Sequence, residues 1–92
     1  MANEQPPATA KEQFWNAVHA WKDLAERHAA ATEAYRMAKA RALLNTAMPT
    51  EAKRGADADL ATAELRTTRD QLSIAMRAAE YEVQFLIAEQ AR

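Results

Sequence analysis

The residues that break helices are concentrated in one short stretch of this chain. Residues 43–57, LLNTAMPTEAKRGAD, contain the only glycine, Gly55, and one proline, Pro49, far from the other two prolines near the N-terminus. Pro49 disfavours helical torsions in the residue before it and has no amide proton to donate, whereas Thr50 and Glu51 suit the cap and first turn of a new helix. The stretch therefore predicts a turn between two helices.

The rest of the chain is typical of long helices, because 24 of its 92 residues are alanine, the best intrinsic helix former. Residues 1–8 contain two prolines and predict a flexible tail. TAKE at the start of the next segment predicts a capping box that opens a helix. We expect one helix over 9–48, a turn at 48–50 and a second helix over 50–91. Gly55 costs about 1 kcal/mol relative to alanine inside a helix, so a later start of the second helix, at Asp57, is the alternative.

Apolar residues recur at three- and four-residue spacing in both predicted helices, as one face of a helix requires. Residues of the second helix also occupy neighbouring faces, and these two stripes exceed what one partner helix can cover. The sequence predicts an all-α fold: an antiparallel two-helix coiled-coil hairpin that dimerises into a helical bundle. The first stripe is Phe14, Val18, Trp21, Leu24, Ala25, His28, Ala31, Thr32, Tyr35, Ala38 and Ala42. The second is Ala58, Ala61, Leu65, Thr68, Leu72, Ala75, Ala79 and Leu86, with Leu60, Ile74, Met76, Tyr81, Val83, Phe85 and Ile87 on the neighbouring faces.

Antiparallel pairing about Pro49 places residues whose numbers sum to about 98 opposite each other, which gathers aromatic side chains at the open end of the hairpin. Aromatic rings dominate core and interface energetics because of their large area. Two interpretations stay open: the rings clamp the termini together, or a tryptophan faces outward and anchors a partner. The predicted partner-binding residues are Trp15, Trp21, Tyr81 and Phe85.

Cations gather at the closed end of the hairpin, next to the turn. Lys39 and Arg41 precede a helix C-terminus, where positive charge is favourable, but Lys53 and Arg54 begin a helix and lack that explanation. This basic tip is either solvated or contacts phosphate or an acidic protein surface. Its predicted members are Arg36, Lys39, Arg41, Lys53 and Arg54.

The residues needed for catalysis or metal binding are sparse. The chain has no cysteine and one serine, Ser73. His19 and His28 are nine residues apart and so lie on different faces of one straight helix. One glycine cannot form a phosphate-binding loop. We therefore expect a protein that is not an enzyme and uses no metal or cofactor.

The pattern Tyr-x-x-Ala-Lys-Ala, here Tyr35, Ala38, Lys39 and Ala40, followed by Arg54 and Ala56, resembles small all-helical proteins encoded by phages and prophages, often of actinobacterial hosts. AMPT stands where the turn of these proteins usually reads glycine followed by Lys-Thr. The resemblance implies an accessory protein, because such genes often lie near phage recombination or replication genes. It implies no catalytic residue.

The formal net charge of −1 gives no overall attraction to nucleic acid, and no apolar run approaches the length of a membrane span. The sequence favours a protein of the host cytoplasm that self-associates, most simply as a dimer, and binds a phage or host protein. An accessory factor of phage recombination or replication that binds nucleic acid through the basic tip is the alternative. A structural component of the virion is a third interpretation.

Overall fold

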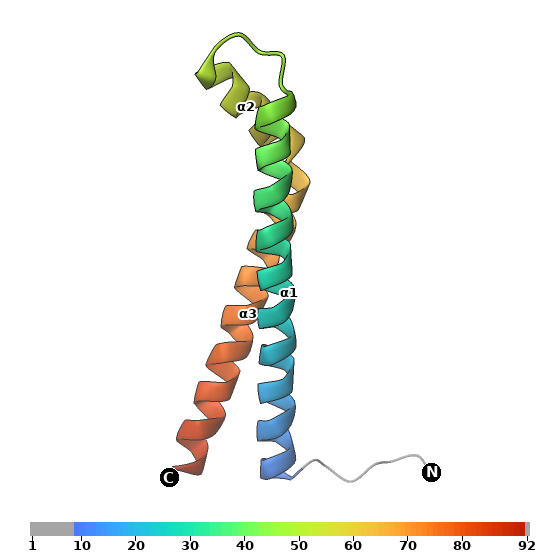
Figure 1. Cartoon of the computed structure of the whole chain (residues 1–92). Coiled ribbons are helices and arrows are strands. Elements are labelled where there is room, and N and C mark those ends of the chain that lie inside the picture. The colour runs from blue at the N-terminus through green and yellow to red at the C-terminus, as the bar shows by residue number, and fades with distance from the viewer. Residues whose placement is uncertain (1–8, 92) are drawn as a thin grey trace, which may run out of the picture.

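The computed structural model describes residues 9–91, and these residues form three α-helices. Helix α1 spans Ala10–Asn45, α2 spans Glu51–Ala61 and α3 spans Ala63–Gln90, with no strand among the described residues (Figure 1). The predicted all-α class is confirmed. The predicted tail at residues 1–8 lies outside the described residues.

The chain reverses direction once, after α1, and α2 and α3 then run back beside it (Figure 1). α1 packs against both later helices. The molecule is elongated, 65 Å along its longest axis and only 14 Å along its shortest. The shortest dimension leaves room for little more than one helix diameter of about 10–12 Å, so within residues 9–91 no third layer covers the outer faces of the helices.

Threonine caps begin the first two helices where the sequence predicts them. The hydroxyl of Thr9 accepts a hydrogen bond from the Glu12 amide at 3.1 Å, and that of Thr50 accepts one from the Lys53 amide at 3.2 Å. Gly55 lies inside α2, which confirms the favoured start near Thr50 over the later one.

α1 ends three residues before the predicted position, because Thr46 leaves the helix with φ −72° and ψ 138°. Its hydroxyl donates to Asp57 Oδ2 at 2.7 Å and accepts from the Met48 amide at 3.3 Å. These bonds compete with continuation of the helix.

The predicted single helix over 50–91 is wrong, because the structure interrupts it at Thr62. Thr62 has φ −112° and ψ 11°, and its hydroxyl donates to the carbonyl of Ala58 at 2.7 Å. A threonine hydroxyl bound to the carbonyl four residues earlier often bends a helix, although Thr32 and Thr67 make the same bond without interrupting their helices. The two segments diverge in direction, so that α2 leans across the closed end while α3 follows α1 (Figure 1).

The interior of the molecule is thin. Among the described residues only Ala58 and Thr62 are buried, at 0% and 3% exposure, and no large side chain is fully buried. The facing sides of α1 and α3 are half-buried and carry the predicted three- and four-residue spacing. On α1 the larger half-buried side chains are Phe14, Val18, Leu24, His28, Tyr35 and Lys39, and on α3 they are Arg69, Leu72, Met76, Val83 and Leu86.

Candidate interaction surfaces

The strongest candidate surface is the solvent-exposed side of α3, of which one residue, Phe85, also borders the pocket between α1 and α3 described below. At about 100° per residue, five residues of α3 from position 74 onward fall within about 40° of one line along the helix, and this line lies roughly opposite the half-buried side. We call these residues the outer face: Ile74, Ala78, Tyr81, Phe85 and Ala88.

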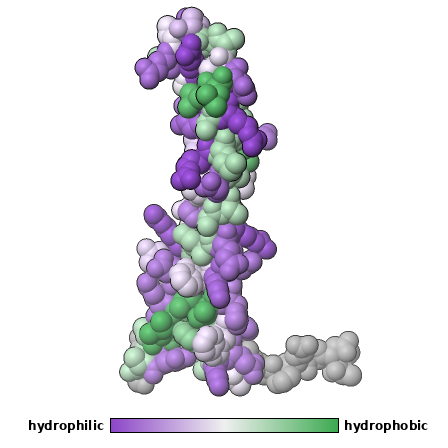
Figure 2. Space-filling view, viewed as in Figure 1, coloured by the Kyte–Doolittle hydropathy of each residue, from purple (hydrophilic) through white to green (hydrophobic). Residues whose placement is uncertain are grey.

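All five residues of the outer face are exposed. Its three large side chains keep 71% (Ile74), 69% (Tyr81) and 59% (Phe85) of their surface exposed. Figure 2 shows hydrophobic surface gathered near the open end, where the C-terminal part of α3 lies. The outer face corresponds to apolar residues that the sequence placed beyond the reach of one partner helix.

Both tryptophans of α1 are partly exposed to solvent. Trp15 is 49% exposed and Trp21 is 36% exposed. The Phe14 ring meets Trp15 edge to face at 5.5 Å, and Trp15 lies 6.3 Å from the His19 ring. In the described part of the chain, no ring contact joins these α1 side chains to Tyr81 or Phe85. The partner-binding role predicted for the four aromatic residues stays a prediction.

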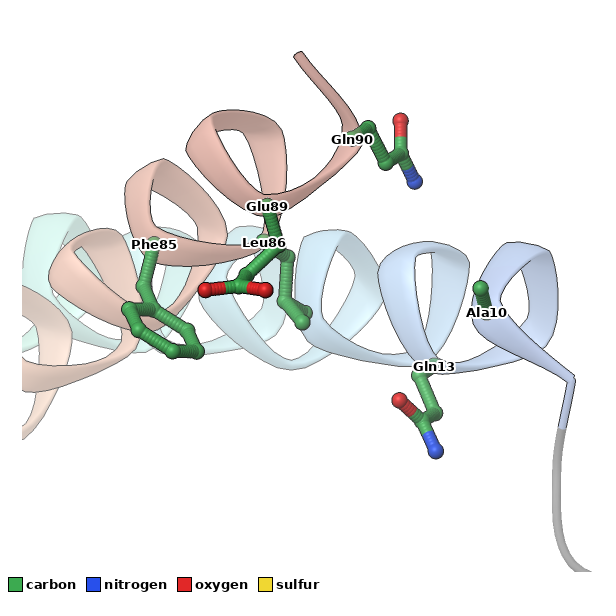
Figure 3. Close-up of a pocket in the computed structure, with 6 residues that line it drawn as sticks. All are labelled: Ala10, Gln13, Phe85, Leu86, Glu89 and Gln90. Atoms are coloured by element: carbon green, nitrogen blue, oxygen red, sulfur yellow. The ribbon is translucent and has the colours of Figure 1, made fainter. Parts of the chain in front are cut away.

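The open end holds a cavity of about 490 Å³ between the first turn of α1 and the last turns of α3. In Figure 3, Leu86 and Glu89 extend from α3 towards α1. This arrangement agrees with the pairing expected from the sequence, in which residue 13 lies opposite residue 85. The lining residues are Ala10, Gln13, Phe85, Leu86, Glu89 and Gln90.

Three of the five cations of the predicted basic tip are engaged within the chain. Arg36 pairs with Glu33 at 2.9 Å and Lys39 pairs with Asp59 at 3.3 Å. Arg54 donates from Nε to the carbonyl of Met48 at 2.8 Å, which ties α2 to the turn. The expectation that Arg54 lacks a structural explanation is therefore wrong.

The closed end is also less basic than the sequence suggested. Residues 33–60 contain the five predicted cations and four carboxylates, because Asp57 and Asp59 of α2 join Glu33 and Glu51. Within residues 9–91, the side chains of Arg41 and Lys53 alone among the five cations make no ion pair or hydrogen bond. The charge available for an anionic partner is correspondingly small.

A cluster around Tyr35 joins all three helices. The Arg69 guanidinium lies 4.5 Å from the Tyr35 ring centre and Lys39 Nζ lies 5.9 Å from it, both within cation–π range. Arg69 also pairs with Asp70 at 2.9 Å. The hydrogen bond and charge of Asp59, followed by the contribution of Tyr35, raise the pKa of Lys39 above its ordinary value. Asp59 was not among the predicted residues, although a pairing sum of 98 sets residue 59 opposite residue 39.

The remaining candidate groups form no recognisable chemical site. His28 is half-buried and its carbonyl accepts a hydrogen bond from the Thr32 hydroxyl at 2.8 Å. Residues 9–91 contain no group of three or more acidic or histidine side chains placed to hold a metal ion. None of the helices in this range combines the length and apolar character that a membrane crossing needs.

Comparison with known proteins gives no match: no family model, curated protein or solved structure aligns significantly with this chain.

Proposed function

We propose that this protein acts without catalysis, as a helical module that binds proteins, its own copies included, through the outer face of α3. The observation that carries the proposal is the exposure of Ile74, Tyr81 and Phe85 along one line of a regular helix. Contiguous exposed apolar surface on a small protein marks an interaction site, because its burial is favourable by about 25 cal/mol per Å².

The thin interior supports the same function. A chain of this size buries only about 60–65% of its unfolded surface and is marginally stable alone. Here the described residues include no large side chain that is fully buried. Covering the outer face supplies apolar burial that the single chain lacks.

We further propose that the protein is an accessory protein of phage or prophage origin that acts in the host cytoplasm. The support is the sequence resemblance at Tyr35, Ala38, Lys39 and Ala40. Tyr35 and Lys39 belong to the cluster that joins the three helices, so we interpret this motif as one that maintains the helical packing. We therefore assign the binding of partner proteins to the outer face.

The proposal is tested by comparing what tagged variants retain from an extract of infected host cells. We expect specific host or phage proteins to be retained by the unmodified chain and lost when Tyr81→Ala and Phe85→Ala are combined. Leu44→Ala is the matched control, because Leu44 is a highly exposed apolar residue of the closed end. A second double variant, Trp15→Ala with Trp21→Ala, asks whether α1 contributes. Equal retention by all variants would contradict the proposal.

The alternative of nucleic-acid binding rests on Arg41 and Lys53, the two cations of the closed end that make no ion pair or hydrogen bond within residues 9–91. Titration of labelled single- and double-stranded oligonucleotides at about 50 mM salt separates the two functions, because phosphate binding is strongest at low salt. Absence of binding, or binding unchanged by Arg41→Ala with Lys53→Ala, removes this alternative.

A further inference from the structure

We propose that the outer face of α3 binds the same face of a second copy, with the two α3 helices parallel and in register. This inference rests on the binding role of the outer face and names its occupant. The result is a row of helices in which each α3 lies between its own α1 and the α3 of the second copy.

The spacing of the outer face is that of a coiled-coil seam. Ile74, Ala78, Tyr81, Phe85 and Ala88 follow one another at intervals of four, three, four and three residues. Such a pattern inserts side chains of one helix into gaps of another and keeps the seam facing its partner. Because the opposite side of α3 already packs on α1, the helix carries two seams, of which the single chain covers one.

The charges that flank the outer face favour the parallel orientation. Arg77 lies on one flank and Glu82, five residues later, lies on the other. In a parallel pair of helices each such residue faces the one five positions later on the other helix. Arg77 of each copy therefore meets Glu82 of the other, which gives two equivalent ion pairs. Within residues 9–91 neither side chain has an ion-pair partner, so both are available.

The antiparallel orientation lacks this complementarity. In an antiparallel pair, equivalent flanks face each other. Two antiparallel registers bury both Tyr81 and Phe85 against the second copy. In these registers Glu82 lies opposite either Ala75 or Glu82 of the second copy, and no carboxylate lies opposite Arg77. Like charges placed opposite each other are unfavourable. The pattern of charge therefore selects one orientation without adding much affinity.

The area of the outer face points to a dimer of modest affinity. An aromatic side chain can bury about 150–250 Å², and Tyr81 and Phe85 keep well over half of their surface exposed. The four rings of a dimer then contribute on the order of 500 Å², against the roughly 1,200–2,000 Å² of a stable interface. Ile74, the alanines and the stems of Arg77 and Glu82 add to this area. We expect micromolar association.

Orientation is measured with single cysteines, because the chain has none of its own. Parallel packing brings the thiol of an Ala88→Cys variant next to its counterpart on the second copy, within disulfide range, whereas either antiparallel register separates the two by at least about 15 Å. We expect rapid oxidation of this variant to a covalent dimer. Ala30→Cys, exposed on α1, is the matched control and forms no covalent dimer under the same conditions.

Charge reversal then tests the predicted ion pairs by sedimentation equilibrium. Arg77→Glu and Glu82→Arg should each weaken the dimer about fivefold to tenfold, because two attractions become two repulsions. The combined variant restores opposite charges and should associate within about twofold of the unmodified chain.

The outcomes distinguish this inference from the proposed function. If the chain stays monomeric at high micromolar concentration, the outer face does not bind a second copy and this inference is wrong. The proposed function survives that result if Tyr81 and Phe85 are still required to retain another protein. A dimer in which Ala88→Cys is not oxidised, or in which the combined charge variant is no stronger than the single ones, overturns the parallel orientation.

Discussion

The closed end and the open end of this molecule are held together in different ways. At the closed end, polar contacts join segments on either side of the turn: Thr46 with Asp57, Arg54 with Met48 and Lys39 with Asp59. The two residues that are buried in the described part of the chain, Ala58 and Thr62, lie nearby in sequence. At the open end, α1 and α3 line a pocket that is open to solvent, and their exposed aromatic residues include Trp15, Tyr81 and Phe85. The difference indicates that contacts within the chain stabilise the closed end, and we propose that a partner covers the exposed apolar surface of the open end.

The largest expected effect of a substitution contrasts a buried alanine with an exposed one. Ala58→Leu places a large side chain where the structure has no free surface, so we expect a loss of about 1–3 kcal/mol in the free energy of unfolding. Ala78→Leu on the outer face should cost less than about 0.5 kcal/mol. Urea denaturation of both variants at one protein concentration measures the difference. Equal losses would mean that the closed end is not the better packed region.

The basic doublet of the closed end offers the next contrast. Arg54→Ala removes the hydrogen bond to the Met48 carbonyl and should lower the free energy of unfolding by about 0.5–1.5 kcal/mol. Lys53→Ala removes a side chain with no partner in the described part of the chain and should change it by less than about 0.5 kcal/mol. Thermal unfolding of the two variants is the measurement. A larger effect of Lys53→Ala would contradict the assignment of the stabilising contact to Arg54.

Gly55 provides a stabilising change. A Cβ added at this position meets no atom within 4 Å, and the backbone does not have a positive φ. Gly55→Ala should therefore raise the free energy of unfolding by about 0.5–1 kcal/mol, because alanine loses less backbone entropy in a helix. A destabilised variant in denaturant titration would show that α2 is strained or frayed at this point.

The smallest expected effect concerns pH. Because the folded state raises the pKa of Lys39 above 10.5, its pairing with Asp59 stabilises the fold below pH 10.5 and this stabilisation is lost as pH rises through the raised pKa. We expect Asp59→Asn to lower the urea midpoint slightly at about pH 8 and to have a smaller effect above the pKa of Lys39. An effect that grows at alkaline pH would have the wrong sign.

Local sequence signals predicted the ends of helices better than their continuity. The caps at Thr9 and Thr50 and the turn at Pro49 each depend on a few adjacent residues, and the structure confirms them. The break at Thr62 accompanies a hydroxyl bond to the Ala58 carbonyl inside a buried contact. Thr32 makes the same bond to the carbonyl of His28 inside the uninterrupted α1, so neither the residue type nor this bond alone reveals the break.

The candidate surfaces show the same contrast between features that a sequence pattern predicts and features that depend on the three-dimensional structure. Periodicity predicted more apolar residues than one partner helix can cover. Of the residues assigned to the neighbouring faces, Ile74, Tyr81 and Phe85 are exposed, whereas Met76 and Val83 are half-buried. The basic tip was overestimated, because counting nearby charges along the sequence left out Asp57 and Asp59. The side-chain bond from Arg54 to a loop carbonyl follows from the shape of the turn, which no spacing rule supplies.

Amide hydrogen exchange at two protein concentrations tests most directly whether a second copy covers the outer face at the open end. We predict that the amides of α2 exchange at the same rate at low and high micromolar concentration, whereas those of residues 75–90 exchange more slowly at the higher concentration because the outer face becomes covered. Exchange in residues 75–90 that is independent of concentration, and as slow as in α2, would contradict the account.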